Sequence, residues 1–211
     1  MERQQEVMNM NESNSLKKTK VLVGMAIFTA LVVVLQLMSG VIKIGMFSPS
    51  LVLIPIVIGA AVYGAAAGAW LGLVFGVVVF ICCVTGADPG GNAMFVFNPM
   101  VTALICLGKG AAAGWLAALV FRSLQHKNQI LATALAAIVC PVVNTGLFCL
   151  GAVAVFKPLL LGWAAAFGYA ETELTTYVFV GLIGLNFLLE VLINVILSPV
   201  VVRILKVRKI A

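Results

Sequence analysis

Six polar side chains lie inside or at the ends of long apolar stretches, where a membrane makes such groups costly. They occur in four of these stretches and are Gln36, Asn98, Lys109, Asn144, Asn186 and Glu190. An ionisable or amide group in hydrocarbon is unfavourable unless it is paired, so it marks a functional site by default. Charge and hydrogen bonding are the chemistry that these groups offer. We therefore interpret them as candidate groups for binding a small solute.

The charges of Lys109 and Glu190 leave two interpretations open. As an ion pair they neutralise each other, and the pocket then favours an uncharged ligand. At a rise of 1.5 Å per residue, Lys109 lies ~15 Å and Glu190 ~21 Å from the outer ends of their stretches, which favours separation. A separate Lys109 is available to a carboxylate or phosphate on a small, vitamin-like ligand. Asn186, Glu190 and Asn194 share one helical stripe, and the two amides could equally be interhelical hydrogen-bond partners.

Composition shows which elements carry these residues. The chain is 63% hydrophobic and only 9% charged. Most of its basic residues gather in three clusters separated by apolar runs, Lys17–Lys20, Arg122–Lys127 and Arg203–Lys209. A bilayer crossing needs about 20 apolar residues, and Lys and Arg are retained on the cytoplasmic side. An even number of crossings therefore separates each cluster from the next.

Six crossings satisfy this rule. The predicted fold class is an all-α integral membrane protein with six transmembrane helices and both termini in the cytoplasm. The predicted spans are Val21–Gly40, two short spans within Leu51–Val84 that turn at Tyr63-Gly64, Pro99–Phe121, Ile130–Phe156 and Thr176–Ile204. Residues 1–16 are polar and predict a disordered cytoplasmic tail, followed by a membrane domain over residues 17–211.

The predicted outer loops are Val41–Ser50, Thr85–Asn98 and Lys157–Thr175. The second is rich in turn-forming residues but ends in the apolar run Met94–Phe97. Such a segment is expected to fold down over the helices as a lid.

Several functions are excluded by the residues present. The net charge of +6 is accounted for by membrane topology and not by nucleic-acid binding. The single histidine, His126, gives no basis for a metal site, and no residue pattern predicts an enzyme or a cofactor. The five cysteines fall in apolar spans without CxxC spacing and are interpreted as small buried hydrophobes. No GxxxxGK[ST] motif occurs, so the chain does not itself hydrolyse ATP.

Small residues repeat at intervals of four on three helices. Ala26 and Ala30 form such a pair on the first span, and Gly110 and Gly114 form another on the fourth. A longer series runs from Gly64 through Gly76. Such stripes allow helices to approach closely. For the glycine series we expect packing within the protein.

The order of these features resembles a known family. A basic segment leads into KVLVGMAIFTA (residues 20–30), and the region of the second and third spans reads GAAVYGAAAGAWLGLVFG. With six predicted helices, this arrangement is similar to the substrate-binding S components of energy-coupling factor (ECF) transporters. The resemblance covers the chain from Lys17 onward.

The resemblance implies roles for particular segments. Ala26 and Ala30 would dock on a transmembrane coupling subunit, which works with two cytoplasmic ATPase subunits. The substrate site would be formed by the fourth to sixth helices near the outer face and capped by Val41–Ser50 and Thr85–Asn98. The protein would be a multi-pass subunit of a bacterial-type plasma (inner) membrane. The chain does not begin Met-His, unlike nickel and cobalt members, which argues against a metal substrate.

Two other classes are compatible with the residues alone. A stand-alone secondary transporter or channel could use Lys109 and Glu190 as a charge relay and would need no ATPase. An intramembrane enzyme is disfavoured because no His/Asp or Ser/Lys arrangement is present.

Overall fold

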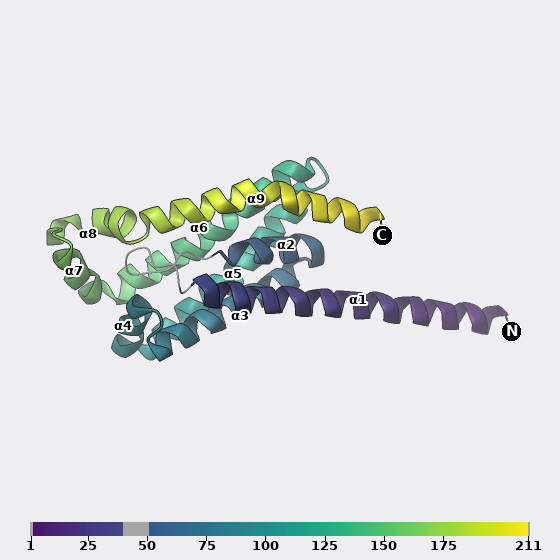
Figure 1. The fold of residues 1–211 in the computed structure, drawn as a ribbon, viewed down its shortest axis with the longest axis horizontal. Coiled ribbons are helices and arrows are strands. Elements are labelled where there is room, and N and C mark those ends of the chain that lie inside the picture. Colours follow the sequence, from purple (N-terminus) through teal and green to yellow (C-terminus); the bar gives the residue numbers. More distant parts are fainter. Residues whose placement is uncertain (1, 40–50, 211) are drawn as a thin grey trace.

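The computed structural model describes residues 2–39 and 51–210, which form helices joined by short connections. The elements are α1 (Glu2–Ser39), α2 (Leu53–Tyr63), α3 (Ala65–Thr85), α4 (Pro89–Phe97), α5 (Pro99–Leu124), α6 (Gln129–Val155), α7 (Lys157–Ala166), the 3₁₀ turn η1 (Glu171–Glu173), α8 (Leu174–Thr176), the π-helix η2 (Tyr177–Leu182) and α9 (Gly184–Ile210). They build an elongated bundle (Figure 1). The start of α1 and the end of α9 lie toward the same end, and α4, α7 and α8 lie at the other.

Five of the described helical segments are long and apolar enough to cross a membrane. They are Ser15–Ser39, Ala65–Thr85, Pro99–Leu124, Gln129–Val155 and Glu171–Ile204. Large apolar side chains cover their outer faces; Leu104 and Leu150, for example, are 71% and 70% exposed. A continuous exposed apolar surface of this kind is typical of contact with lipid. The chain is therefore an all-helical, multi-pass membrane protein.

The turn predicted at Tyr63-Gly64 is confirmed. Gly64 separates α2 from α3 with a φ of 96°, a conformation that glycine adopts without the steric cost of a Cβ. A Cβ placed there would lie 3.7 Å from the Arg122 guanidinium carbon. The end of α5 therefore meets the start of α3, and Arg122 lies near the carbonyl end of α2, where a cation is favourable.

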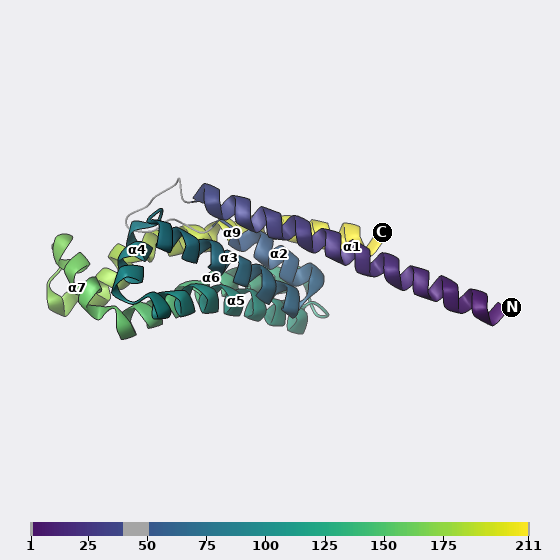
Figure 2. The same ribbon diagram turned by 90° about the horizontal axis from the view of Figure 1, so that it is seen from below.

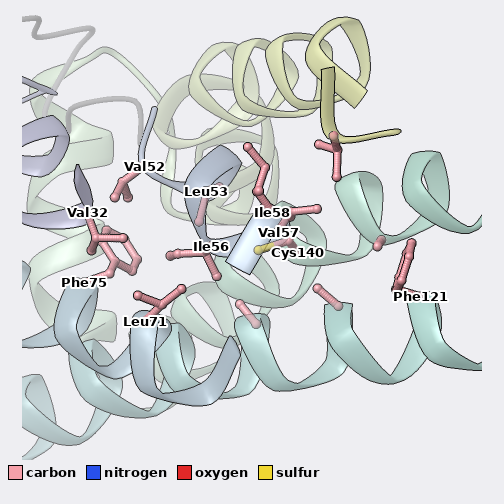
Figure 3. Close-up of a cluster of buried hydrophobic side chains, with 14 of the residues drawn as sticks. Val32, Val52, Leu53, Ile56, Val57, Ile58, Leu71, Phe75, Phe121 and Cys140 are labelled. Carbon is pink, nitrogen blue, oxygen red and sulfur yellow. The ribbon is translucent and has the colours of Figure 1, made fainter. Parts of the chain in front are cut away.

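The second predicted span is shorter than a transmembrane helix. α2 has 11 residues, or about 16 Å of helix, against about 30 Å of hydrocarbon. It nevertheless lies at the centre of the bundle, packed against α1, α3, α5, α6 and α9. Its apolar side chains, including Ile56 and Val57, are buried on several faces (Figure 3). Among the described residues, five helices are long and apolar enough to cross a membrane and α2 is a shorter apolar helix, so the count of six crossings stays a prediction.

α3 and α5 pack backbone against backbone, as the glycine pattern predicted. A Cβ at Gly72 would collide with the carbonyl oxygen of Gly110, and one at Gly110 would collide with that of Gly72. Gly68 and Gly114 form a second reciprocal pair. The indices rise along one helix while they fall along the other, so the helices are antiparallel. The glycine series on α3 and the pair on α5 therefore serve packing inside this protein.

The direction of α1 follows from its contacts with the next segments. Gly24 lies against the hydroxyl of Tyr63, and the side chain of Trp70 donates a 3.3 Å hydrogen bond to Thr29 farther along α1. α1 and α3 therefore run in the same direction, and the connection between them returns the chain. Figure 2 shows α1 along one edge of the bundle, extending beyond it on the N-terminal side. This arrangement brings the three basic clusters toward one end.

The polar N-terminal segment is part of α1. α1 begins at Glu2 and continues without a break into the apolar span. The segment contains several Glu, Gln and Met residues, which are good helix formers. Extending an existing helix avoids the cost of nucleation. The apolar span therefore supplies the nucleus from which the polar segment continues as helix.

Candidate functional site

Buried polar side chains lie between two apolar clusters of the bundle. On α6, Cys140 belongs to the first cluster and Cys149 to the second, and the buried Asn144 lies between them. Val201 on α9 belongs to the first cluster, and Leu182 at the end of η2 belongs to the second. The interval between these two residues contains four buried polar residues, Asn186, Glu190, Asn194 and Ser198. The polar groups thus form a layer inside the membrane domain, enclosed by apolar packing on both sides.

Lys109 lines a small cavity in the same region. The cavity measures about 30 Å³, room for about two water molecules. α3, α4, α5 and α6 all contribute side chains to it. Its lining residues are Val79, Cys83, Asp88, Gly91, Met94, Thr102, Ile105, Cys106, Lys109 and Phe148. The wall is mainly apolar with a few polar groups, as in small-molecule sites.

α5 sets the depth of Lys109. The helix begins with Asn98 as its cap, whose side chain accepts a 3.2 Å hydrogen bond from the Val101 amide, and with Pro99 at the first position. From there Lys109 lies about 15 Å along the axis. Its ammonium nitrogen is 5.8 Å from the ring centre of Phe75 and 5.1 Å from that of Phe148. Such cation–π contacts are stronger when desolvated, so they hold the charge inside the bundle.

α4 covers the cavity from the outer end. This segment was expected to fold down as a lid, and the structure packs it against α3 and α5. The Asn92 amide donates a 2.8 Å hydrogen bond to the Cys83 carbonyl, and Phe95 meets Phe80 edge to face with ring centres 5.8 Å apart. A Cβ at Gly91 would collide with the Cys83 sulfur, so the lid backbone lies directly on α3.

Glu190 lies at a different level from Lys109. Its side chain is 6% exposed and lies near Cys140 on α6. Lys109 instead lies over Phe148 on α6. The eight residues between Cys140 and Phe148 amount to about 12 Å along the helix. α6 packs against both α5 and α9. This geometry supports a separate Lys109 over an ion pair with Glu190.

Comparison with known proteins places this bundle in a family. The sequence model described as "ECF transporter, substrate-specific component" matches residues 20–202. This chain belongs to that family. The resemblance stated from the sequence is thus confirmed, and the protein is the substrate-binding subunit of an ECF transporter. The matched segment includes α2 to α7 and most of α9, and therefore every element that lines the site.

A relative of known name is similar over most of its length. The pantothenic acid transporter PanT of Lactococcus lactis subsp. cremoris (strain MG1363) is 30% identical over 190 residues, which are 84% of this chain and 89% of that protein. The family is one of transporter components, in keeping with the expectation that the chain is not an enzyme.

The S component's other predicted site residues lie in different environments. Asn144 is 4% exposed, and its Oδ1 accepts no hydrogen bond from the residues that the structure describes. The same holds for Oε1 of Gln36, near the end of α1. The Asn98 side chain caps α5 and does not line the cavity. The predicted loop Val41–Ser50 lies outside the described residues.

The two alanines of α1 face outward. Ala26 and Ala30 are exposed, whereas Val32 and Gln36 on the same helix are buried. Exposed Ile27, at 57%, continues the outward face. This face is open for contact with lipid or another membrane helix.

The sequence analysis did not identify some residues that line the cavity. It places Asp88 only in an outer loop, although Asp-Pro is a strong helix-start pattern. Thr102 precedes Lys109 by seven residues, which places both on one helical face. Cys83 and Cys106 were correctly interpreted as buried, but their place at the cavity depends on packing between α3 and α5.

Proposed function

We propose that this S component captures pantothenate, or a closely similar small carboxylate, for import. The observation that supports it is the half-buried Lys109 ammonium at a small cavity within the membrane domain. A desolvated ammonium is stabilised by an anion that shares its burial. The similarity to a pantothenic acid transporter selects pantothenate among small carboxylates.

The hydroxyl and amide groups of pantothenate can form hydrogen bonds with the buried polar residues. The molecule carries two hydroxyl groups and one amide, all of which can donate hydrogen bonds. Buried acceptors without a partner are unfavourable. Oδ1 of Asn144 and Oε1 of Gln36 are such acceptors among the described residues. We assign them, with Asn186 and Glu190, to the hydroxyl and amide part of the ligand, and Asn98 to shaping the entrance as cap of α5.

The cavity must enlarge to admit this ligand. A volume of about 30 Å³ holds about two water molecules, far less than pantothenate. α4 is the short element that covers the cavity, and few polar contacts hold it to α3. Binding therefore involves movement of α4, with the described structure as the closed form.

Transport requires partners that this chain does not supply. We assign Ala26 and Ala30 to docking on a transmembrane coupling subunit, since both are exposed on α1 and small residues permit close helix approach. Two cytoplasmic ATPase subunits supply the energy. With the connection from α1 to α3 counted as a crossing, the chain crosses a bacterial plasma membrane six times. Both termini and the 122–129 loop then lie in the cytoplasm.

Equilibrium binding of radiolabelled pantothenate to the purified protein tests the substrate. Lys109→Met keeps the length and apolar stem of the side chain but removes its charge. It should weaken binding by at least 1–2 kcal/mol, roughly tenfold or more. Lys157→Met is the matched control, because this exposed lysine lies on α7 outside the cavity lining. Equal affinity in the two variants would remove Lys109 from the site.

Reconstitution tests the assignment of partners. Vesicles that contain the S component together with the coupling and ATPase subunits should accumulate pantothenate when ATP is present. Vesicles with the S component alone should not. Concentrative uptake by the chain alone would instead support a stand-alone transporter.

A further inference from the structure

Asp88 brings a second charge to the cavity that contains Lys109. Both residues line the cavity, one from the start of α4 and the other from α5. Cys83 on α3 and Cys106 on α5 line the same cavity. A carboxylate carried by the lid and an ammonium carried by the bundle therefore share one small space.

The lid holds the Asp88 side chain in place. Asp88 caps α4, and its Oδ1 accepts a hydrogen bond from the Gly91 amide at 3.3 Å. The Asp88 amide donates to the Cys82 carbonyl at 3.2 Å. A Cβ at Gly91 would lie 3.1 Å from Asp88 Oδ2. Because the cap belongs to α4 itself, the carboxylate keeps a hydrogen-bond donor when α4 moves.

The carboxylate of an anionic ligand competes with the Asp88 carboxylate for the Lys109 ammonium. The cavity of about 30 Å³ is far smaller than the ligand, so α4, which is capped by Asp88, must move before the ligand can enter. Two like charges brought together in a shared site disfavour each other's ionised form. The ligand carboxylate can therefore reach Lys109 only as Asp88 withdraws with α4.

We propose that Asp88 is the lid's own counter-charge for the substrate site: it balances Lys109 in the empty protein and is replaced there by the substrate carboxylate. This inference rests on the proposed function and adds a specificity residue to it. Opening of α4 then becomes tied to the charge of the ligand. A neutral analogue cannot replace the charge of Asp88 at Lys109, so the withdrawal of Asp88 does not increase the affinity for that analogue.

Asp88→Asn separates the charge of this residue from its structural role. Asparagine caps helices as well as aspartate does, so α4 keeps its first turn. Asp88→Ser keeps a cap with a shorter side chain and serves as a second variant. Both should bind pantothenate at least about fivefold more tightly than the wild type. Even two unit charges about 10 Å apart interact by more than the equivalent energy at an effective dielectric constant of about 20. Binding of panthenol, in which a primary alcohol replaces the carboxylate, should change by less than about twofold, since it carries no charge.

The gain should depend on Lys109. In a Lys109→Met background, Asp88→Asn should no longer favour pantothenate over panthenol. Pantothenate affinity that is unchanged or weaker in both Asp88 variants would overturn the proposal. An equal gain for panthenol would also overturn it, because the effect would then come from a looser lid and not from charge.

A second readout does not depend on the identity of the substrate. Replacement of Cys82, Cys140 and Cys149 by alanine leaves Cys83 and Cys106, both at the cavity. Their rates of reaction are compared for 2-sulfonatoethyl methanethiosulfonate, which is an anion, and uncharged methyl methanethiosulfonate. Asp88→Asn should raise the ratio of the anionic to the neutral rate by at least about threefold, by the same electrostatic reasoning.

The two readouts distinguish failure of the inference from failure of the proposed function. Absence of pantothenate binding in the wild-type protein would refute the proposed substrate, and the rate ratio would then decide the role of Asp88. A ratio that does not rise in Asp88→Asn would overturn the counter-charge role whatever the substrate is.

Discussion

Gly72→Ala should destabilise the protein because it separates α3 from α5. A Cβ at Gly72 would lie closer to the Gly110 carbonyl oxygen than the 3.0 Å that real Cβ contacts respect. The obstacle is backbone, which cannot rotate away as a side chain can. The two helices must move apart, and a gap of 0.5–1 Å already loses roughly a quarter to a half of the dispersion energy of each contact.

The size of the effect follows from two opposing terms. Alanine gains up to about 1 kcal/mol over glycine within a helix. Overpacking of a well-packed interface costs about 1–3 kcal/mol, and α3–α5 is the most extensive helix interface of the described bundle. The net change should be a loss of up to about 2 kcal/mol in unfolding free energy. Since Gly110 adjoins Lys109, ligand affinity should fall as well.

Gly108→Ala is the matched control on the partner helix. A Cβ there meets nothing within 4 Å, so the helix-forming gain is not opposed. Unfolding in detergent, followed by tryptophan fluorescence with increasing SDS, should rank the proteins as Gly108→Ala, wild type and Gly72→Ala in order of decreasing stability. The packing argument is refuted if Gly72→Ala proves as stable as Gly108→Ala.

Three further outcomes are expected. Ala26→Leu or Ala30→Leu should abolish uptake by the reconstituted transporter but leave binding by the isolated protein unchanged, whereas Ala154→Leu on an exposed part of α6 should affect neither; loss of binding with intact assembly would contradict the docking role. A cysteine introduced at His126 in a cysteine-free protein should not react with an impermeant external reagent in intact cells, and labelling there would refute the six-crossing topology. Asn92→Ala removes the lid's 2.8 Å hydrogen bond to α3 and should speed pantothenate release by about two- to tenfold, in line with about 0.5–1.5 kcal/mol per hydrogen bond, as measured by filter-binding chase; an unchanged release rate would show that this bond does not hold the lid.

Much of the architecture follows from local sequence. Long apolar runs identify α3, α5 and α6 because each is helical and hydrophobic along its whole length. Gly64 predicts the break between α2 and α3 because few other residues adopt its backbone conformation at low cost. The length of α2 was not predictable in this way, because a half-length apolar helix inside a bundle has the same composition as half of a transmembrane span.

The candidate site was predictable only in part. The rarity of charge within the membrane domain was sufficient to single out Lys109, since burial of an ammonium needs a reason. Sequence position alone assigned Asp88 to an outer loop and Asn98 to the ligand. Folded α4 carries Asp88 into the cavity, and the first turn of α5 uses the Asn98 side chain as its cap.

The sequence by itself therefore determined the class of protein, the family and the one lysine deep in the membrane domain, because hydrophobicity and charge act residue by residue. Tertiary structure alone decided which groups meet that lysine. Phe75 on α3 and Phe148 on α6 contact Lys109, and Asp88 at the start of α4 lines the same cavity. They are brought together because glycine contacts hold α3 against α5 and because α4 folds back over both. Contacts of this kind depend on the relative placement of distant segments, which no local pattern encodes.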